Sequence, residues 1–240
     1  MCFHLSLSKT AQQIENRFNA KFFNAKNFSP VFHASGFKYP EHPVVTNHAK
    51  EEIGFFNWGL IPSWVKSKEA ADEFRAYTLN ARTENVFEKP SFRSAIVKRR
   101  CLIPASGFFE WQTIGTKKYP YYISLKNQEI FSFAGIWESW EEPSLDGERV
   151  NSFSILTTEA NELMAKIHNI KKRMPVILPA NKEDYWLSPN LKKEEIEKFF
   201  TQYPSEEMQA HTISKRITSR SDNPNSAETL EPFVYAELKN

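Results

Sequence analysis

The sequence contains only two cysteines, Cys2 and Cys101, among 240 residues. Two cysteines cannot form the disulfide framework of a small secreted protein. The CxxC and HExxH patterns are also missing, and the six histidines are scattered along the chain. These absences argue against a zinc site, and we expect neither a metal nor a cofactor.

Long apolar segments are missing as well. No run approaches the roughly 20 residues that a membrane-spanning helix requires. Polar Ser8, Lys9 and Thr10 interrupt the segment where a signal peptide would have its apolar core. We therefore expect a cytoplasmic protein that does not contact a membrane. The charged fraction of 25% argues against disorder, and the formal net charge of +2 gives no particular support to a dedicated nucleic-acid binder.

What the sequence does contain is a succession of strand-like segments. No internal repeat or low-complexity linker divides it, so we expect one domain over residues 1–240, with a tail from about residue 215 that is mostly loop. Strands are predicted at 52–61, 98–105, 119–125, 129–140, 150–158 and 174–179, and helices at 10–22, 157–168, 181–187 and 191–203. Because strands outnumber helices and do not alternate with them, the expected fold class is α+β: a mainly antiparallel, strongly bent sheet, or pseudo-barrel, with short flanking helices.

Local signals mark where some of these elements begin or turn. Thr10 and Gln13 fit a capping box for the first helix, whose apolar face would extend to Phe22. Thr157 or Thr158 is expected to cap the helix at 157–168. Asp146-Gly147 lies between two strand-like runs and indicates a tight turn.

Aromatic residues are abundant, with 20 Phe, 8 Tyr and 6 Trp making up 14% of the chain. The simplest interpretation is a large packed core. Base stacking in a groove is the functional alternative, and it would require aromatic residues beside basic ones.

Glu110 lies between Phe109 and Trp111 in an apolar segment. A carboxylate among aromatic rings is costly to ionise, so its pKa tends to rise toward the range useful for acid–base catalysis. Simple strand alternation, with Glu110 facing water, is the competing interpretation. From the residues alone the two remain open.

Asn80 and Arg82 are two positions apart in the segment NARTEN, and an extended chain would place them on the same face. Asn80 could orient a polar group, and Arg82 could bind an anion with two hydrogen bonds. A capping Asn beside a solvated Arg would give the same pattern.

His168 stands at a predicted helix end and is followed by Lys171, Lys172 and Arg173. A histidine at a helix end is typical of a cap, and a basic run is typical of a solvated face. Cys101 lies in the apolar segment CLIP, where we expect a buried core cysteine.

Several of these segments occur together in a recognisable order. MC, NWGLIPSW, NARTEN, RRCLIPASGFFEW, FAGIWESW, FSILTTEAN and IHN…RMPVIL follow one another from Cys2 to at least Leu178. Their order and approximate spacing resemble the SOS-response-associated peptidase (SRAP) family.

The resemblance implies that Cys2 is the reactive residue once Met1 is removed. Its free α-amine would condense with the aldehyde of an abasic site in single-stranded DNA, and its thiol would then close a thiazolidine ring. Unperturbed pKa values of about 8 for the amine and about 8.5 for the thiol leave usable fractions of both at neutral pH. The product would be a covalent cross-link that shields the lesion, as part of a DNA-damage (SOS) response.

The resemblance also implies roles for other residues. Asn80 would hold the α-amine or the sugar, Glu110 would shuttle protons, and His168 would act as general acid–base on the sugar hydroxyl. Arg82 is the expected phosphate contact, and Trp64 would stack on a base or wedge at the lesion, unless it packs in the core. The expected sites are therefore catalytic (Cys2, Asn80, Glu110, His168) and DNA-binding (Arg82, Trp64, His4, Thr157, Arg173).

This chain departs from the family pattern at two places. Many members begin MCGR, whereas this chain has Phe3 and His4 after Cys2. The fixed cation of the family pattern is therefore missing, which weakens one expected phosphate contact unless His4 supplies a hydrogen bond there. Between His168 and Met174 the chain carries NIKKR, which is longer than the compact form IHNRMP and alters the geometric context of Arg173.

Three functions are weighed on this basis. The first is covalent capture of abasic sites by a monomer associated with the nucleoid when bound to DNA. The second is a cysteine peptidase or amidase that uses Cys2, His168 and Asn80 and could release Met1 by self-cleavage. The third is a noncovalent single-stranded nucleic-acid-binding module in which Cys2 is incidental.

Overall fold

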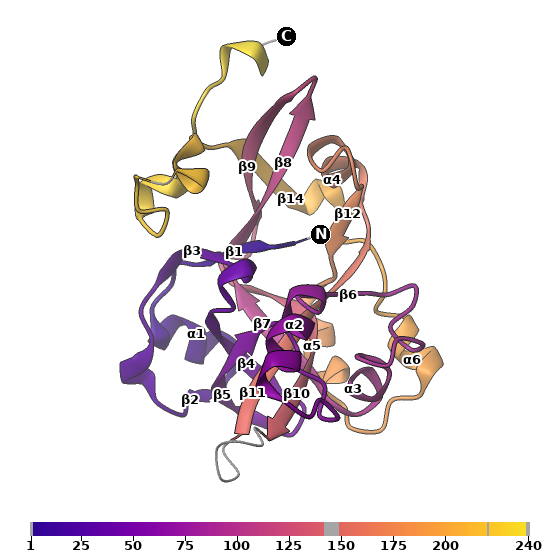
Figure 1. Cartoon of the computed structure of the whole chain (residues 1–240). Coiled ribbons are helices and arrows are strands. Elements are labelled where there is room, and N and C mark those ends of the chain that lie inside the picture. The colour runs from indigo at the N-terminus through magenta and orange to yellow at the C-terminus, as the bar shows by residue number, and fades with distance from the viewer. Residues whose placement is uncertain (1, 142–148, 220, 239–240) are drawn as a thin grey trace.

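The computed structural model describes residues 2–141, 149–219 and 221–238, and the predicted turn at Asp146-Gly147 lies outside these ranges. Two β-sheets with short helices around them form the α+β architecture that the sequence predicted (Figure 1). The strands are β1 (His4–Leu7), β2 (Lys21–Phe22), β3 (Val31–Ser35), β4 (Glu41–Thr46), β5 (Ala49–Trp58), β6 (Asn80–Arg82), β7 (Arg100–Ala105), β8 (Gly107–Ile114), β9 (Lys117–Leu125), β10 (Phe131–Glu141), β11 (Arg149–Glu159), β12 (Arg173–Pro175), β13 (Ile177–Leu178) and β14 (Met208–Thr212).

The helices are short. The α-helices are α1 (Ala11–Phe18), α2 (Lys68–Tyr77), α3 (Arg93–Lys98), α4 (Glu162–Ile167), α5 (Glu183–Trp186) and α6 (Lys193–Glu197). The 3₁₀ helices are η1 (Ala25–Asn27), η2 (Gly36–Lys38), η3 (Ala180–Lys182), η4 (Ser205–Glu207), η5 (Lys215–Thr218), η6 (Ala227–Leu230) and η7 (Ala236–Leu238). No helix in the described part of the chain is long and apolar enough to cross a bilayer.

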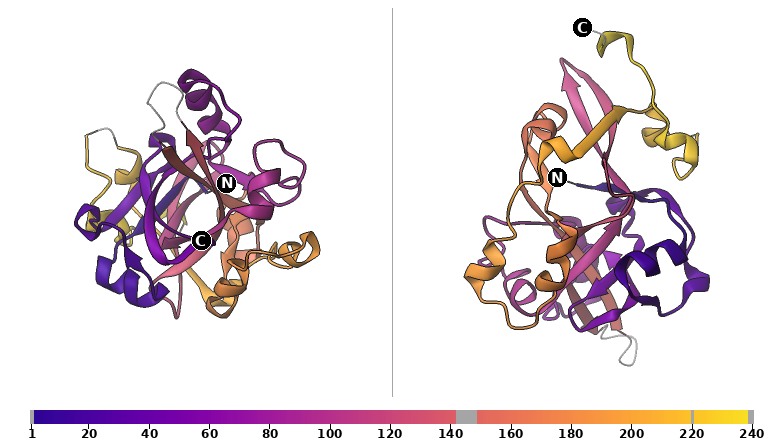
Figure 2. Two further views of the ribbon diagram at one scale, coloured as in Figure 1. Left: turned by 90° about the horizontal axis from the view of Figure 1, so that it is seen from below. Right: turned by 180° about the vertical axis from the view of Figure 1, so that it is seen from behind.

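Five strands close into a barrel. They are hydrogen-bonded in the order β11-β10-β7-β4-β5, and β5 returns to β11. A ring of five strands cannot alternate direction throughout, so one contact must be parallel. It is the closing one, which pairs Asn57 with Ser152 and Trp58 with Phe153. The closed barrel confirms the predicted strongly bent sheet, and Figure 2 shows it from below.

The second sheet has the order β14-β9-β8-β1-β3 and carries the amino terminus. Its strand β1 begins two residues after Cys2 and is paired on both sides, with Leu5 opposite Phe108 on β8 and Ala34 on β3. The β8–β9 hairpin projects from the barrel beside α4, which packs against β8 (Figure 1). The start of the chain is thereby part of this sheet, and Cys2 shares a hydrophobic cluster with Met164 and Ile167 of α4.

Many aromatic side chains pack in the core, as the simplest interpretation of the composition predicted. Trp58, Trp137, Trp140 and Trp186 are buried, and each indole N–H donates a hydrogen bond to an oxygen at 2.7–3.2 Å. Cys101 is fully buried among such residues, and burial raises the pKa of its thiol. The prediction of a core cysteine is confirmed.

The first predicted helix is right at its start and too long at its end. The capping box is present, since the Thr10 N–H donates to Gln13 Oε1 at 2.9 Å and the Gln13 N–H donates to Thr10 Oγ1 at 3.3 Å. The helix stops at Phe18 because Asn19 adopts the left-handed conformation, with φ +48°. Phe22 lies instead in strand β2.

The expected cap by Thr157 or Thr158 is wrong. Both threonines belong to β11, and α4 begins only after Asn161, whose side-chain oxygen accepts from the Met164 N–H at 2.9 Å. The strand therefore continues further than its threonines suggested. Helix α6 is shorter than the predicted 191–203, and helices α2 and α3 were not predicted.

Arg100 is completely buried and is satisfied by carbonyl oxygens. Its guanidinium donates to the carbonyls of Ile96, Val97, Trp186 and Ser188, which lie at the carboxyl ends of α3 and α5. Burial lowers its pKa to about 10, so it stays charged at neutral pH. One cation thus satisfies the ends of two helices that lean on the barrel.

We predict that Arg100→Met lowers the free energy of unfolding by about 3 kcal/mol or more, because buried carbonyls lose their donor while the chain keeps a similar volume. Urea unfolding followed by tryptophan fluorescence measures the change. Arg93→Met, at an exposed position on α3, is the matched control and should stay within about 0.5 kcal/mol of wild type. Equal stabilities for the two variants would contradict the role of Arg100.

Candidate active site around the amino terminus

Cys2 is fully buried at the entrance to β1. Its Sγ lies 3.7 Å from the His4 carbonyl oxygen, to which the thiol donates. Burial, and secondarily the nearby Glu110 carboxylate, raise the pKa of this thiol well above its ordinary value. The expectation of a substantial thiolate fraction at neutral pH therefore does not hold in the chain that begins with Met1.

Glu110 is a buried carboxyl group. It lies on β8 opposite Tyr121 of β9, and only 5% of the residue is exposed. Burial raises the pKa of Glu110 to about 7. The interpretation in which strand alternation turns Glu110 toward water is wrong, because the strongly twisted hairpin is covered on both faces at this point. Near neutral pH this group can both give and accept a proton.

His168 faces Glu110 in a defined tautomer. It follows the last residue of α4, and its Nδ1 lies 2.9 Å from the Arg173 carbonyl oxygen. A carbonyl can only accept, so Nδ1 carries the proton and Nε2 presents a lone pair. Nε2 is 3.7 Å from Glu110 Oε2. Burial lowers the pKa of His168 to about 4, which keeps the ring neutral at pH 7.

Asn80 presents a buried side-chain amide. It lies on β6, pairs with Ile155 of β11, and is 8% exposed. Neither its Oδ1 nor its Nδ2 finds a hydrogen-bond partner among the described residues. An unsatisfied buried amide destabilises the fold by about 1–3 kcal/mol. Such a group is suited to bind a ligand that supplies the missing hydrogen bonds.

Two of the expected DNA contacts are engaged within the protein. The Arg173 guanidinium bonds to both carboxylate oxygens of Glu84 and, at 2.7 Å, to the Thr157 carbonyl oxygen. Thr157 is fully buried, and its hydroxyl lies 3.3 Å from the same guanidinium. Arg82 differs, because it is exposed, although it lies close enough to Glu84 to help Arg173 lower the pKa of that carboxyl group. Of the expected phosphate contacts, Arg82 is the accessible one.

His4 forms a pair that the sequence did not indicate. Its Nδ1 lies 2.9 Å from Nε2 of His33 on β3, and the two rings are stacked. Burial lowers the pKa of His4 to about 3 and that of His33 to about 4, so both rings are neutral at physiological pH. His4 also meets Trp111 edge-on. No spacing in the sequence links residues 4 and 33, which are joined only by the β1–β3 pairing.

Trp64 is not a core residue. Half of it is exposed, and its ring packs edge-on against Phe74 of α2. The packing interpretation is therefore wrong for this tryptophan, which presents an open face to solvent.

A cavity of about 560 Å³ brings Glu110 and His168 together with His4. Its wall also includes Phe3, Trp111, Thr113, Thr218 and the exposed Lys118, Ile170 and Lys171. The other expected site residues do not line it: Cys2, Trp64, Asn80, Arg82, Thr157 and Arg173. The cavity is mainly apolar. Its inner polar groups are the neutral imidazoles of His4 and His168 and the carboxyl group of Glu110, whose pKa is about 7.

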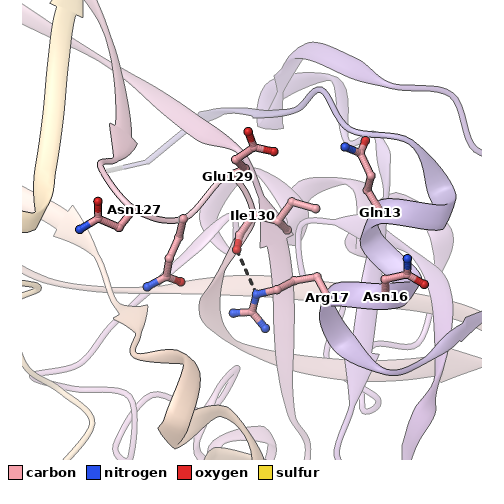
Figure 3. Close-up of a pocket in the computed structure, with 7 residues that line it drawn as sticks. Gln13, Asn16, Arg17, Asn127, Glu129 and Ile130 are labelled. Carbon is pink, nitrogen blue, oxygen red and sulfur yellow. Dashed lines mark hydrogen bonds between the residues drawn. The ribbon is translucent and has the colours of Figure 1, made fainter.

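A second cavity, of about 490 Å³, lies beside α1 and contains none of the expected site residues (Figure 3). There the Arg17 Nε donates to the Ile130 carbonyl oxygen at 3.1 Å. Among the described residues, no cluster of three or more His, Cys, Asp or Glu side chains is arranged to hold a metal ion.

The chain is similar to known proteins over most of its length. The family model described as SOS response associated peptidase (SRAP) matches residues 1–220.

The chain belongs to this family.

Two curated SRAP relatives come from Bacillus subtilis. Abasic site processing protein YoqW is 36% identical over 216 residues, covering 87% of this chain and 92% of its own. Abasic site processing protein YoaM is 33% identical over 237 residues, covering 96% of this chain and 98% of its own. A crystal structure of a protein from Bacteroides thetaiotaomicron matches with a TM-score of 0.91 at 39% identity, covering 97% of this chain and all of that one.

The raised pKa of Glu110 has a measurable effect on folding. The folded state binds the Glu110 proton more tightly than the unfolded state, so this residue stabilises the protein at low pH and that contribution is lost as the pH rises. We predict that Glu110→Gln gains about 3 kcal/mol relative to wild type between about pH 4.5 and pH 7, at about 1.4 kcal/mol per pKa unit. Urea unfolding at a series of pH values measures it. A stability difference independent of pH would show that Glu110 ionises normally.

Proposed function

We propose that this SRAP protein captures abasic sites in single-stranded DNA by forming a thiazolidine with Cys2 after removal of Met1. The observation that carries the proposal is the Glu110–His168 pair beside Cys2, in which a carboxyl group with a pKa of about 7 faces a neutral imidazole nitrogen. The names of the relatives as abasic site processing proteins support the same substrate.

The chemistry requires no oxidant or metal. The α-amine of Cys2 adds to the aldehyde carbon of the ring-opened sugar, and the carbinolamine then loses water to give a Schiff base. The Cys2 sulfur adds to the same carbon while its proton goes to the nitrogen. One C–N bond and one C–S bond replace the C=O bond, and one water leaves.

Each proton transfer in this sequence has a group suited to it. The His168 lone pair at Nε2 can accept the proton of the sugar hydroxyl as the ring opens. Protonated Glu110 can then donate to the departing hydroxyl of the carbinolamine. As a carboxylate, Glu110 can then take the proton from the Cys2 thiol, whose raised pKa would otherwise keep it on sulfur, and pass it to the nitrogen. The unsatisfied amide of Asn80 would hold the amine or the sugar oxygen.

Phosphate binding is assigned to exposed cations around the site. Arg82 is exposed and accessible, whereas Arg173 is held by hydrogen bonds to Glu84. In this proposal Arg173 orients His168 through its carbonyl and does not contact DNA. Lys118 and Lys171 on the cavity wall add positive charge.

A cysteine-peptidase mechanism receives less support from the same geometry. A peptidase thiol acts as a thiolate whose pKa is lowered by an adjacent imidazolium. Here burial raises the thiol pKa, and His168 bonds to the Arg173 carbonyl and faces Glu110. A purely noncovalent binding module would leave the Glu110–His168 pair without a purpose.

Cys2→Ala is expected to abolish covalent capture because the variant keeps the amine but has no thiol to close the ring. Noncovalent binding should persist, since Arg82 and the lysines remain. The measurement is intact-mass spectrometry of the protein after incubation with a single-stranded oligonucleotide containing one abasic site.

Cys101→Ala is the matched control and should form the adduct at the wild-type rate, because Cys101 is buried in the core. A dehydrated, stable adduct of the Cys2→Ala protein would rule out the thiazolidine. Turnover of added peptides without any DNA adduct would favour the peptidase instead.

Arg82→Ala is predicted to weaken binding to undamaged single strands of any sequence. The loss of one phosphate contact should make the slope of log K against log salt concentration shallower by about 0.7. Fluorescence anisotropy at several salt concentrations measures this slope, with Arg93→Ala on α3 as an exposed-arginine control that leaves it unchanged. An identical slope for Arg82→Ala and wild type would remove Arg82 from the phosphate contacts.

A further inference from the structure

An exposed aromatic residue stands beside the reactive end of the chain. Phe37 in η2 is 58% exposed, although a phenylalanine ring is among the groups that most favour burial. Its ring centroid is 4.8 Å from that of Phe3, the residue that follows Cys2. Phe3 lines the 560 Å³ cavity, so Phe37 extends the aromatic surface from the cavity outward.

The backbone holds this pair in place. The Gly36 N–H donates to the Phe3 carbonyl oxygen at 2.8 Å, which ties η2 to the amino terminus. Gly36 is packed tightly, since a Cβ there would lie 3.2 Å from the buried ring of Trp58. Phe37 is therefore presented at a fixed position relative to Cys2 and does not depend on a flexible loop.

The surroundings match a nucleobase and the phosphate attached to it. Phe37 has the edge of His4 on one side, at a centroid distance of 6.1 Å, and His4 remains neutral at physiological pH. The next residue, Lys38, is exposed and lies close enough to lower the pKa of His33. An open aromatic face beside a lysine is the combination that binds single-stranded nucleic acid, the base on the ring and the phosphate on the cation.

We propose that Phe37, supported from behind by Phe3, is the stacking platform for one base that flanks the abasic sugar. This inference rests on the proposed function. A nucleotide next to an abasic site has lost a stacking neighbour, and Phe37, whose ring packs against the residue that follows Cys2, supplies a replacement surface beside the reactive end of the chain. The platform therefore favours lesions that retain a base beside them.

The experiment is a cycle between protein and DNA. Rates of covalent capture are measured at subsaturating protein concentration. The reference oligonucleotide keeps both bases next to the abasic site. In two others the 5′ or the 3′ neighbour is replaced by a tetrahydrofuran spacer, which has neither a base nor an aldehyde. We expect one of the two spacers to slow wild-type capture by about tenfold, within the range of one base–aromatic stack. Phe37→Ala should slow capture of the normal oligonucleotide by about the same factor and be insensitive to that spacer.

Three variants sharpen the result. Phe37→Trp should restore capture, whereas Phe37→Leu, which keeps apolar area without a ring face, should behave as Phe37→Ala. Phe23→Ala is the matched control, because Phe23 is 80% exposed beside β2 on the barrel. It should capture at the wild-type rate and remain sensitive to the spacer.

The inference is overturned if Phe37→Ala captures the normal oligonucleotide as fast as wild type does. It is also overturned if the spacer lowers the capture rate of Phe37→Ala by the same factor as that of wild type. Failure of the proposed function gives a different result, namely no adduct of the wild-type protein with any abasic oligonucleotide. In that case the same cycle is run as equilibrium binding of tetrahydrofuran-containing strands. Non-additive effects of Phe37→Ala and the spacer would still support the platform, and additive ones would reject it.

Discussion

The hydrogen bond from His168 Nδ1 to the Arg173 carbonyl is the interaction on which the rest of the site depends. It decides which imidazole nitrogen carries the proton and therefore which one faces Glu110. The carbonyl itself is held because the Arg173 side chain is bound to Glu84 and to Thr157 of β11. The ion pair between Arg173 and Glu84 thus fixes the tautomer of the His168 ring without contacting that ring.

The two sheets meet around the first residues of the chain, and this arrangement accounts for the unusual electrostatics. Strand β1 inserts between β8 and β3, which carries Cys2 toward Glu110 and away from solvent. Burial then acts in opposite directions on different groups, raising the pKa of the carboxyl and the thiol and lowering that of His168. Near neutral pH the thiol and the imidazole are therefore uncharged, and Glu110 is poised between its two protonation states.

Sequence reasoning located β5, β7, β9, β10, β11 and the α+β class because apolar runs and β-branched residues mark these strands locally. It did not predict β8, which carries Glu110, and it missed the short strands β1 and β3, which gain their stability from neighbours far along the chain. With β1 and β3 it missed the His4–His33 pair. The family resemblance indicated Asn80, Glu110 and His168, but it also grouped Arg173 with the DNA contacts. Only the structure shows its ion pair with Glu84, because nothing in the spacing of residues 84 and 173 brings them together.

The closure of the barrel has a consequence for how the protein is made. Asn57 cannot meet Ser152 until β11 has left the ribosome, and His168 emerges later still. Cys2 is meanwhile among the first residues to be exposed. During synthesis the thiol lies in an open chain without Glu110 and His168 beside it, and contacts between such distant segments form slowly. Cys2 therefore becomes enclosed, and gains Glu110 and His168 as neighbours, only when the last of these segments is in place: the end of the chain that is made first is completed last.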